Sequence, residues 1–213
     1  MKHLRVQFLS VGHDAPINDL SRELDIMQKN GIETASWFAY RYKPEVFFAI
    51  AYSENSLCLK FYVSEKFVRA VYANPNDPVH KDSCVEFFIS FEDESEYYNF
   101  EFNCAGTCML GFGTERAGRK LIPQEVIGLI RHQALLMPAG SPDANIGWEL
   151  TLMIPLKAFH YHQVKTLKGK RGRINFYKCG DELPEPHFLV WNNIKTEHPD
   201  FHVPECFGSM EFN

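Results

Sequence analysis

The sequence contains no apolar run that approaches the ~20 residues of a membrane-spanning helix. Its first ten residues include only a short apolar stretch, and the acidic residues Asp14, Asp19 and Glu23 follow soon after. No signal peptide is recognised, so we expect a cytoplasmic protein. Positive charge is also not in excess, since 22 Lys and Arg face 27 Asp and Glu, a net charge of −5. This balance argues against binding to nucleic acid or to an anionic membrane.

Internal repeats, low-complexity tracts, glycine-rich phosphate loops and the GxSxG nucleophile pattern are likewise missing from the sequence. The best candidate linker, residues 137–147, is short enough to be a hairpin loop. We therefore predict one domain over residues 1–213, in which residues 1–43 form an N-terminal extension that packs on the rest. The sequence leaves the oligomeric state open.

Six cysteines are present, but their spacing does not indicate a metal site. Cys104 and Cys108 are four residues apart, and no second closely spaced pair of cysteines or histidines accompanies them, whereas a structural zinc needs four converging ligands. We expect six free thiols, none of them bound to zinc, that pack as small hydrophobic groups.

Aromatic residues are abundant, at 14% of the chain, and they favour strands and sandwich cores. Apolar spacing predicts short helices over Pro16–Lys29 and Pro123–Gln133. Turn residues bound eight predicted strands: Val46–Ser53, Leu57–Ser64, Cys84–Phe91, Tyr97–Cys104, Gly147–Ile154, Arg173–Cys179, Phe188–Trp191 and Phe207–Phe212. We predict an all-β fold, a two-sheet β-sandwich or jelly roll with one or two short peripheral helices.

Successive side chains of a strand point to opposite faces of its sheet, and one parity is apolar in strand after strand. The residues of this parity predict the core between the two sheets. They include Leu59, Phe61, Val85, Phe87, Phe100, Phe102, Trp148, Leu150, Leu152 and Phe176.

The other parity carries carboxylates, carboxamides, phenols and a guanidinium, which donate and accept hydrogen bonds in fixed directions. These residues are Lys60, Tyr62, Glu86, Asn99, Glu101, Asn103, Glu149, Thr151, Arg173, Asn175 and Tyr177. If their strands lie in one sheet, they form one surface. Two interpretations stay open: a concave, ligand-facing sheet that binds a polyhydroxylated molecule, or a solvated face held by salt bridges.

Three glutamates of this parity, Glu86, Glu101 and Glu149, also allow an enzyme that acts on glycosidic bonds through a pair of carboxyl groups. Lys60 and Arg173 are expected nearby and would keep these groups ionised. A structural or interaction domain is the third alternative. No cofactor is predicted, and calcium is only weakly indicated, by the turn residues Asp77, Asp82 and Asp181.

Several motifs, in order, resemble carbohydrate-binding module family 9. The run from Asp82 to Ile89 (DSCVEFFI) is similar to the family's DSVE strand, and Tyr97–Asn103 is similar to the strand that follows it. Trp148–Pro155 resembles the W-E-IP strand, and the C-terminal third is matched by residues 173–181, Trp191 and residues 204–208. The resemblance runs from about Pro44 to the end of the chain. It implies a sandwich of the DOMON-like group, whose members bind sugars or haem.

Sugar-binding members of that family hold a terminal sugar between two tryptophan rings. Trp191 matches one of these positions, and we expect it at the rim of the polar face. The loop 71–80 should supply the other ring but has no tryptophan, which leaves Tyr72 and His80 as candidates. The predicted function is non-catalytic carbohydrate binding on the polar face. The predicted site is Glu86, Asn99, Glu101, Asn103, Arg173, Asn175, Tyr177, Trp191, Tyr72 and His80.

Overall fold

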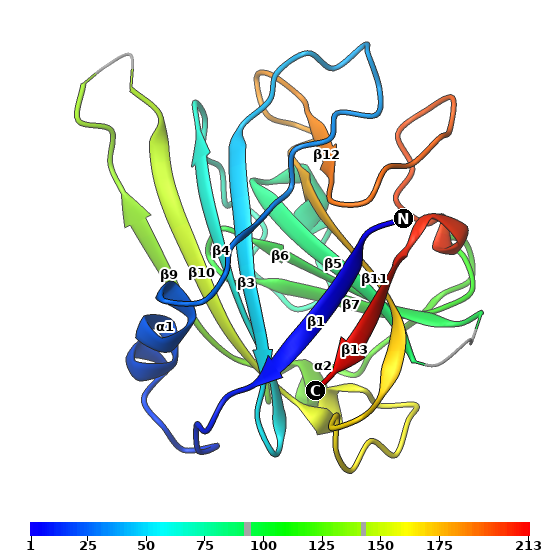
Figure 1. Ribbon diagram of the computed structural model, residues 1–213. Helices are drawn as coiled ribbons and strands as arrows, with labels where there is room; N and C mark the ends of the chain where they lie inside the picture. The colour runs from blue at the N-terminus through cyan, green and yellow to red at the C-terminus, as the bar shows by residue number, and fades with distance from the viewer. Residues whose placement is uncertain (92–94, 142–143) are drawn as a thin grey trace.

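The computed structural model describes residues 1–91, 95–141 and 144–213, and its strands form a two-sheet β-sandwich with little helix (Figure 1). Sheet A has the strand order β8-β7-β6-β5-β11-β13, with β12 beside β11. These strands are β5 (Cys84–Phe91), β6 (Tyr97–Asn103), β7 (Cys108–Gly113), β8 (Lys120–Leu121), β11 (Arg171–Cys179), β12 (Phe188–Val190) and β13 (Gly208–Phe212). Sheet B has the order β3-β4-β10-β9, with β2 beside β3. Its strands are β2 (Asn30–Gly31), β3 (Glu45–Tyr52), β4 (Ser56–Glu65), β9 (Arg131–Met137) and β10 (Ile146–Pro155).

The first strand, β1 (His3–Phe8), joins the two sheets. Its first part pairs in parallel with β13, from His3 opposite Ser209 onward. Its last two residues, Gln7 and Phe8, pair in parallel with β3. The segment 1–43, predicted to be an extension that packs on the sandwich, therefore supplies a strand to it.

The predicted core is confirmed, because every residue named for it is at most 4% exposed. Aromatic stacking links the sheets and fills the space between them. Phe48 of sheet B stacks on Phe176 of sheet A with ring centroids 3.7 Å apart, and Phe87 stacks on Phe100 at 4.5 Å.

The outer face of sheet B is covered by helix α1 (Ile17–Asp25), which is shorter than the predicted Pro16–Lys29. Its apolar stripe, Leu20 and Leu24, is buried against Ala49, Cys58 and Met153. The helix therefore hides a face that the sequence alone leaves open.

The predicted single polar surface is wrong, because its strands belong to different sheets. Lys60 and Glu149 lie on β4 and β10 of sheet B, and Tyr62 and Thr151 share their parity. Under α1, the Lys60 ammonium is buried and lies 2.6 Å from the Asp25 carboxylate and 2.8 Å from that of Glu149. The remaining polar residues of the predicted surface lie on β5, β6 and β11 of sheet A.

The second predicted helix, Pro123–Gln133, is largely wrong. Helix α2 comprises only Gln124–Ile127, and the chain then enters strand β9. Ile127 and Ile130 are buried in the core. The apolar spacing that suggested a longer helix therefore comes from one helical turn and the residues that follow it. Three 3-10 turns complete the fold: η1 (Val79–Lys81), η2 (Leu156–Ala158) and η3 (Pro204–Cys206). None of the helices described here has the length and apolar character needed to cross a membrane.

Candidate functional site

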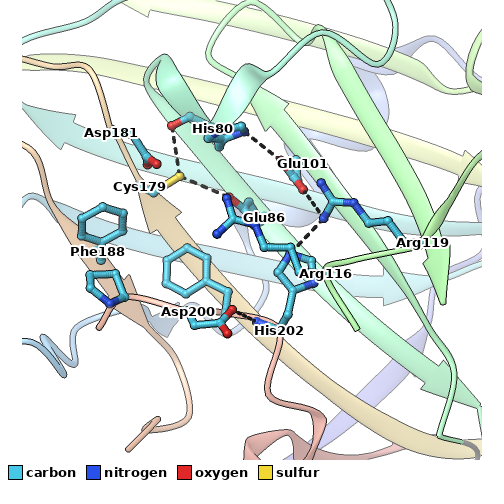
Figure 2. Close-up of a pocket in the computed structure, with 12 residues that line it drawn as sticks. His80, Glu86, Glu101, Arg116, Arg119, Cys179, Asp181, Phe188, Asp200 and His202 are labelled. Atoms are coloured by element: carbon cyan, nitrogen blue, oxygen red, sulfur yellow. Dashed lines mark hydrogen bonds and ion pairs between the residues drawn. The ribbon is translucent and has the colours of Figure 1, made fainter. Parts of the chain in front are cut away.

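A pocket of about 420 Å³, including its open mouth, lies over the outer face of sheet A (Figure 2). Its floor comes from β5, β6 and the end of β11, and its walls come from η1, residues 116–119 and the chain from 188 to 202. Its lining is polar, with four carboxyl groups, two guanidinium groups and two imidazoles. The lining residues are His80, Glu86, Glu101, Arg116, Arg119, Cys179, Asp181, Phe188, Pro199, Asp200, Phe201 and His202.

Two glutamates form the floor, because Glu86 of β5 is directly opposite Glu101 of β6 in the antiparallel register. Both are at most 3% exposed. Burial, followed by the negative charge of Glu101, raises the pKa of Glu86 well above its ordinary range. Glu86 Oε1 accepts a hydrogen bond from the Cys179 thiol at 3.1 Å.

Of the two carboxylate oxygens of Glu101, only Oε1 has a hydrogen-bond partner among the described residues. Its Oε1 accepts a hydrogen bond from Asn99 Nδ2 at 2.7 Å and lies 3.3 Å from the Arg119 guanidinium. Its Oε2 is buried and has no hydrogen-bond partner among the described residues; His80 Nδ1 is 3.7 Å away. A buried carboxylate oxygen without a donor is costly, and Glu101 lines the pocket, so a donor brought by a ligand could satisfy this oxygen.

The Arg119 guanidinium contacts Glu101 on one side and the imidazole of His202 on the other. Its guanidinium donates to His202 Nε2 at 2.9 Å, and Tyr97 Oη lies 2.8 Å from the other ring nitrogen. A guanidinium only donates, so Nε2 accepts and the proton of the neutral ring is on Nδ1. Burial, with the charge of Arg119 as the next cause, lowers the pKa of His202 to about 3, in agreement with a neutral ring.

Asn103, Asn175 and Tyr177 lie on the predicted face, but their polar groups are used inside the protein. Asn103 Nδ2 donates to the Tyr72 carbonyl and to Asp82, and Asn175 Nδ2 donates to the Asn192 carbonyl. The Tyr177 hydroxyl donates to the Phe201 carbonyl at 3.1 Å. These residues are buried beneath loops, so the face is not the solvated one that the structural interpretation requires.

The guanidinium beside the glutamates is Arg119, and the prediction that Arg173 and Lys60 supply this charge is wrong. Arg173 donates to the Pro204 carbonyl at 2.6 Å and does not line the pocket. Glu149 lies on sheet B and pairs with Lys60, so it is not a partner for Glu86 or Glu101.

The predicted rim position of Trp191 is also wrong. Trp191 is 3% exposed and belongs to the main core, with its ring edge-on to Phe48 and Phe176 at about 6 Å. The parity of the short strand β12 and the bend after it turn this ring inward between the sheets. The aromatic rings of the pocket wall come instead from Phe188 and Phe201.

Of the two loop candidates, His80 lines the pocket and Tyr72 does not. The three proposed calcium ligands are dispersed. Asp82 is buried and accepts hydrogen bonds from the backbone of residues 71 and 72, whereas Asp77 accepts from Asn74. Asp181 lies in the pocket, and burial raises its pKa.

Sequence reasoning missed Arg116, Arg119, Cys179, Asp200 and His202. The two arginines belong to the connection from β7 to β8, and Asp200 and His202 belong to a long irregular segment. Alternation along a strand therefore does not predict where these side chains point. One indication existed in the strand CMLGFG of β7. There, outward-facing glycines leave room for a side chain from elsewhere to lie across the sheet.

Comparison with known proteins provides independent evidence on the family of this chain. The family model described as carbohydrate-binding family 9 matches residues 19–212. The chain belongs to carbohydrate-binding family 9. A proposed carbohydrate-binding protein of Bacteroides uniformis ATCC 8492 shares 38% identity, with 100% of this chain and 99% of that chain covered and a TM-score of 0.91. A comparison with curated proteins finds no match.

Two further solved structures are family 9 modules of Caldicellulosiruptor kristjanssonii, one in complex with glucose and one with cellotriose. The glucose complex has 13% identity and a TM-score of 0.62, covering 100% of this chain and 96% of that one. The cellotriose complex has 11% identity and a TM-score of 0.60, covering 99% and 93%. At these identities the likeness concerns the fold, and it confirms the family 9 sandwich that the strand motifs predicted.

Proposed function

We propose that this protein binds a carbohydrate in the pocket above Glu86 and Glu101. The observation that carries the proposal is that Glu101 lines the pocket while its buried Oε2 has no hydrogen-bond donor among the described residues. A sugar hydroxyl is a neutral donor of the right kind, because it satisfies a carboxylate without adding charge to a crowded acidic site.

The rest of the lining suits a polyhydroxylated ligand. Carboxylates accept from hydroxyl groups, and the guanidinium groups of Arg116 and Arg119 donate to hydroxyl oxygens. Phe188 and Phe201 add an apolar wall on which the C–H face of a sugar ring can pack. The enclosed part of the pocket is only about 60 Å³, so it has room for a hydroxyl group or two, and the rest of a sugar ring would lie at the open mouth.

Family membership supports the same ligand class, and the two modules solved with glucose and cellotriose supply the first probes. Each hydroxyl contact replaces a contact with water and contributes only about 1 kcal/mol, so we expect weak binding.

Calorimetric titration with glucose, cellotriose and a wider sugar panel tests the proposal. Glu101→Gln should lower the affinity for the sugar that binds at least tenfold, because an amide presents an NH₂ or a neutral carbonyl where the carboxylate accepted. Glu149→Gln, on the far sheet, is the matched control and should leave affinity unchanged. Equal loss in both variants, or no binding by any sugar, would contradict the proposal. Sugar hydrolysis that Glu101→Gln abolishes would instead establish the enzyme alternative.

A further inference from the structure

Two cysteines that are 95 residues apart in sequence meet beneath the pocket. Cys84 of β5 is directly opposite Cys179 of β11 in the antiparallel register, on the same outer face of sheet A as Glu86. All three residues are buried. The thiols are thus brought together by strand pairing, which the spacing of cysteines along the chain does not reveal.

The donor atoms of these residues converge. The two sulfur atoms and one carboxylate oxygen of Glu86 all lie within 4.8 Å of one another. Glu86 Oε1 is 3.1 Å from Cys179 Sγ and 3.9 Å from Cys84 Sγ. In the part of the chain that the structure describes, no other group of three cysteine, histidine or acidic ligands converges in this way.

The two sulfur–oxygen separations lie on either side of the edge lengths of a tetrahedral zinc site. With Zn–S near 2.3 Å and Zn–O near 2.0–2.2 Å, neighbouring ligand atoms are roughly 3.3–3.8 Å apart. Side-chain rotations would bring all three donors to a common ion. Both sulfurs are soft donors of the kind that select zinc over calcium or magnesium.

Further oxygen donors surround the same point. The Asp181 carboxylate lies beside the Cys179 thiol, and the carbonyl oxygen of His80 is 3.5 Å from the Cys179 sulfur. Figure 2 shows Asp181 and Glu86 on opposite sides of the Cys179 sulfur, with the His80 carbonyl above it. Because Glu86 and Cys179 line the pocket, the fourth position on the ion would face it.

We propose that Cys84, Cys179 and Glu86 form a binding site for Zn²⁺, with the fourth position supplied by Asp181 or by a molecule in the pocket. On binding, each thiol gives its proton to solvent and binds as a thiolate. The proposal replaces the expectation that no thiol binds zinc, which was based on sequence spacing alone. It does not depend on sugar binding.

Cobalt is the probe, because a thiolate bound to Co²⁺ gives a charge-transfer absorption in the near ultraviolet. The full chain is reduced, stripped with chelator and titrated with Co²⁺, and Zn²⁺ is then added to displace the cobalt. We expect one Co²⁺ per chain, the thiolate band, and its loss on adding Zn²⁺. Cys84→Ala and Cys179→Ala should each abolish the band.

Cys58→Ala is the matched control, because Cys58 is equally buried but lies under α1 on sheet B. This variant should keep the band and the stoichiometry. Glu86→Gln retains both thiols and should lower Co²⁺ affinity at least tenfold, so the site stays testable if a cysteine variant fails to fold. An absent band, or a band equal in all variants, would overturn the proposal. A Cys84–Cys179 disulfide in the freshly purified protein together with no uptake after reduction would also overturn it.

Sugar titration of the metal-stripped protein separates the two proposals. Sugar binding without metal uptake would refute only the zinc site. Metal uptake without binding of any sugar would refute only the carbohydrate pocket.

Discussion

The side chain of Arg119 lies directly across Gly111 of β7. A Cβ atom at position 111 would be 3.0 Å from Arg119 Cδ and 2.5 Å from the Asn99 carboxamide oxygen. Asn99 and Arg119 are the two residues that hold Glu101 Oε1. The glycine therefore provides the space in which the floor of the pocket is assembled.

Gly111→Ala should weaken sugar binding at least tenfold, since it displaces the charged hydrogen-bond donor and the amide that orient Glu101. Calorimetric titration is the measurement, with circular dichroism to confirm that the sheet is intact. Gly12→Ala is the control, because nothing lies within 4 Å of a Cβ built there. Unchanged affinity in Gly111→Ala would show that Arg119 has no part in the site.

Phe87→Ala should lower the free energy of unfolding by ~3–5 kcal/mol, the usual cost of a large core cavity. Phe87 is fully buried and stacks on Phe100. Denaturant titration measures the change, and Phe38→Ala, at a residue that is 94% exposed, should change stability little. Similar losses in the two variants would mean that the sheets do not pack as described.

Trp191→Ala should destabilise the fold by ~3–5 kcal/mol, because the ring fills space between the sheets and is not a sugar platform. Phe188→Ala, by contrast, should weaken sugar binding with a smaller loss of stability, because Phe188 is only partly buried and lies on the pocket wall. Thermal unfolding and calorimetry on both variants check this. A stable Trp191→Ala protein that no longer binds sugar would show instead that Trp191 belongs to the binding site.

His187 makes stability depend on pH. Its ring accepts from Lys178 Nζ at Nε2, and burial, followed by the charge of Lys178, lowers the pKa of His187 to about 3. The unfolded ring has a pKa near 6.5, so the unfolded chain binds more protons below that pH and stability falls as pH drops toward 3. Between pH 7 and pH 5, the neutral His187 should lower the free energy of unfolding by roughly 2 kcal/mol.

The measurement compares unfolding free energies at pH 7 and pH 5 in the native protein and in His187→Gln. From pH 7 to pH 5, the free energy of unfolding of the variant should fall by roughly 2 kcal/mol less than that of the native protein. Glu86, whose raised pKa acts in the opposite direction, is common to both proteins and cancels in the comparison. Parallel pH profiles would contradict a neutral, buried His187.

Strand periodicity was enough to predict the core, the fold class and that Glu86 and Glu101 lie on one face, because alternation along a strand fixes which face a side chain takes. It did not say which strands are neighbours. Lys60 and Glu149 were therefore grouped with residues of the opposite sheet, although α1 covers them.

Trp191 was misplaced because it lies in a bend just after a strand of only three residues, where no alternation can be read. Arg119 and His202 were missed because they come from irregular segments, where direction depends on tertiary contacts. The pairing of Cys84 with Cys179 needed the register of β5 and β11, which no local pattern contains.

A crystal structure grown with glucose, or with the sugar that calorimetry selects, would show whether the pocket above Glu86 and Glu101 binds a sugar. We expect a sugar ring between Phe188 and the glutamates, with one hydroxyl within hydrogen-bond distance of Glu101 Oε2 and another near the Arg119 guanidinium. A sugar bound elsewhere, such as beside Tyr62 on sheet B, with this pocket empty would contradict it.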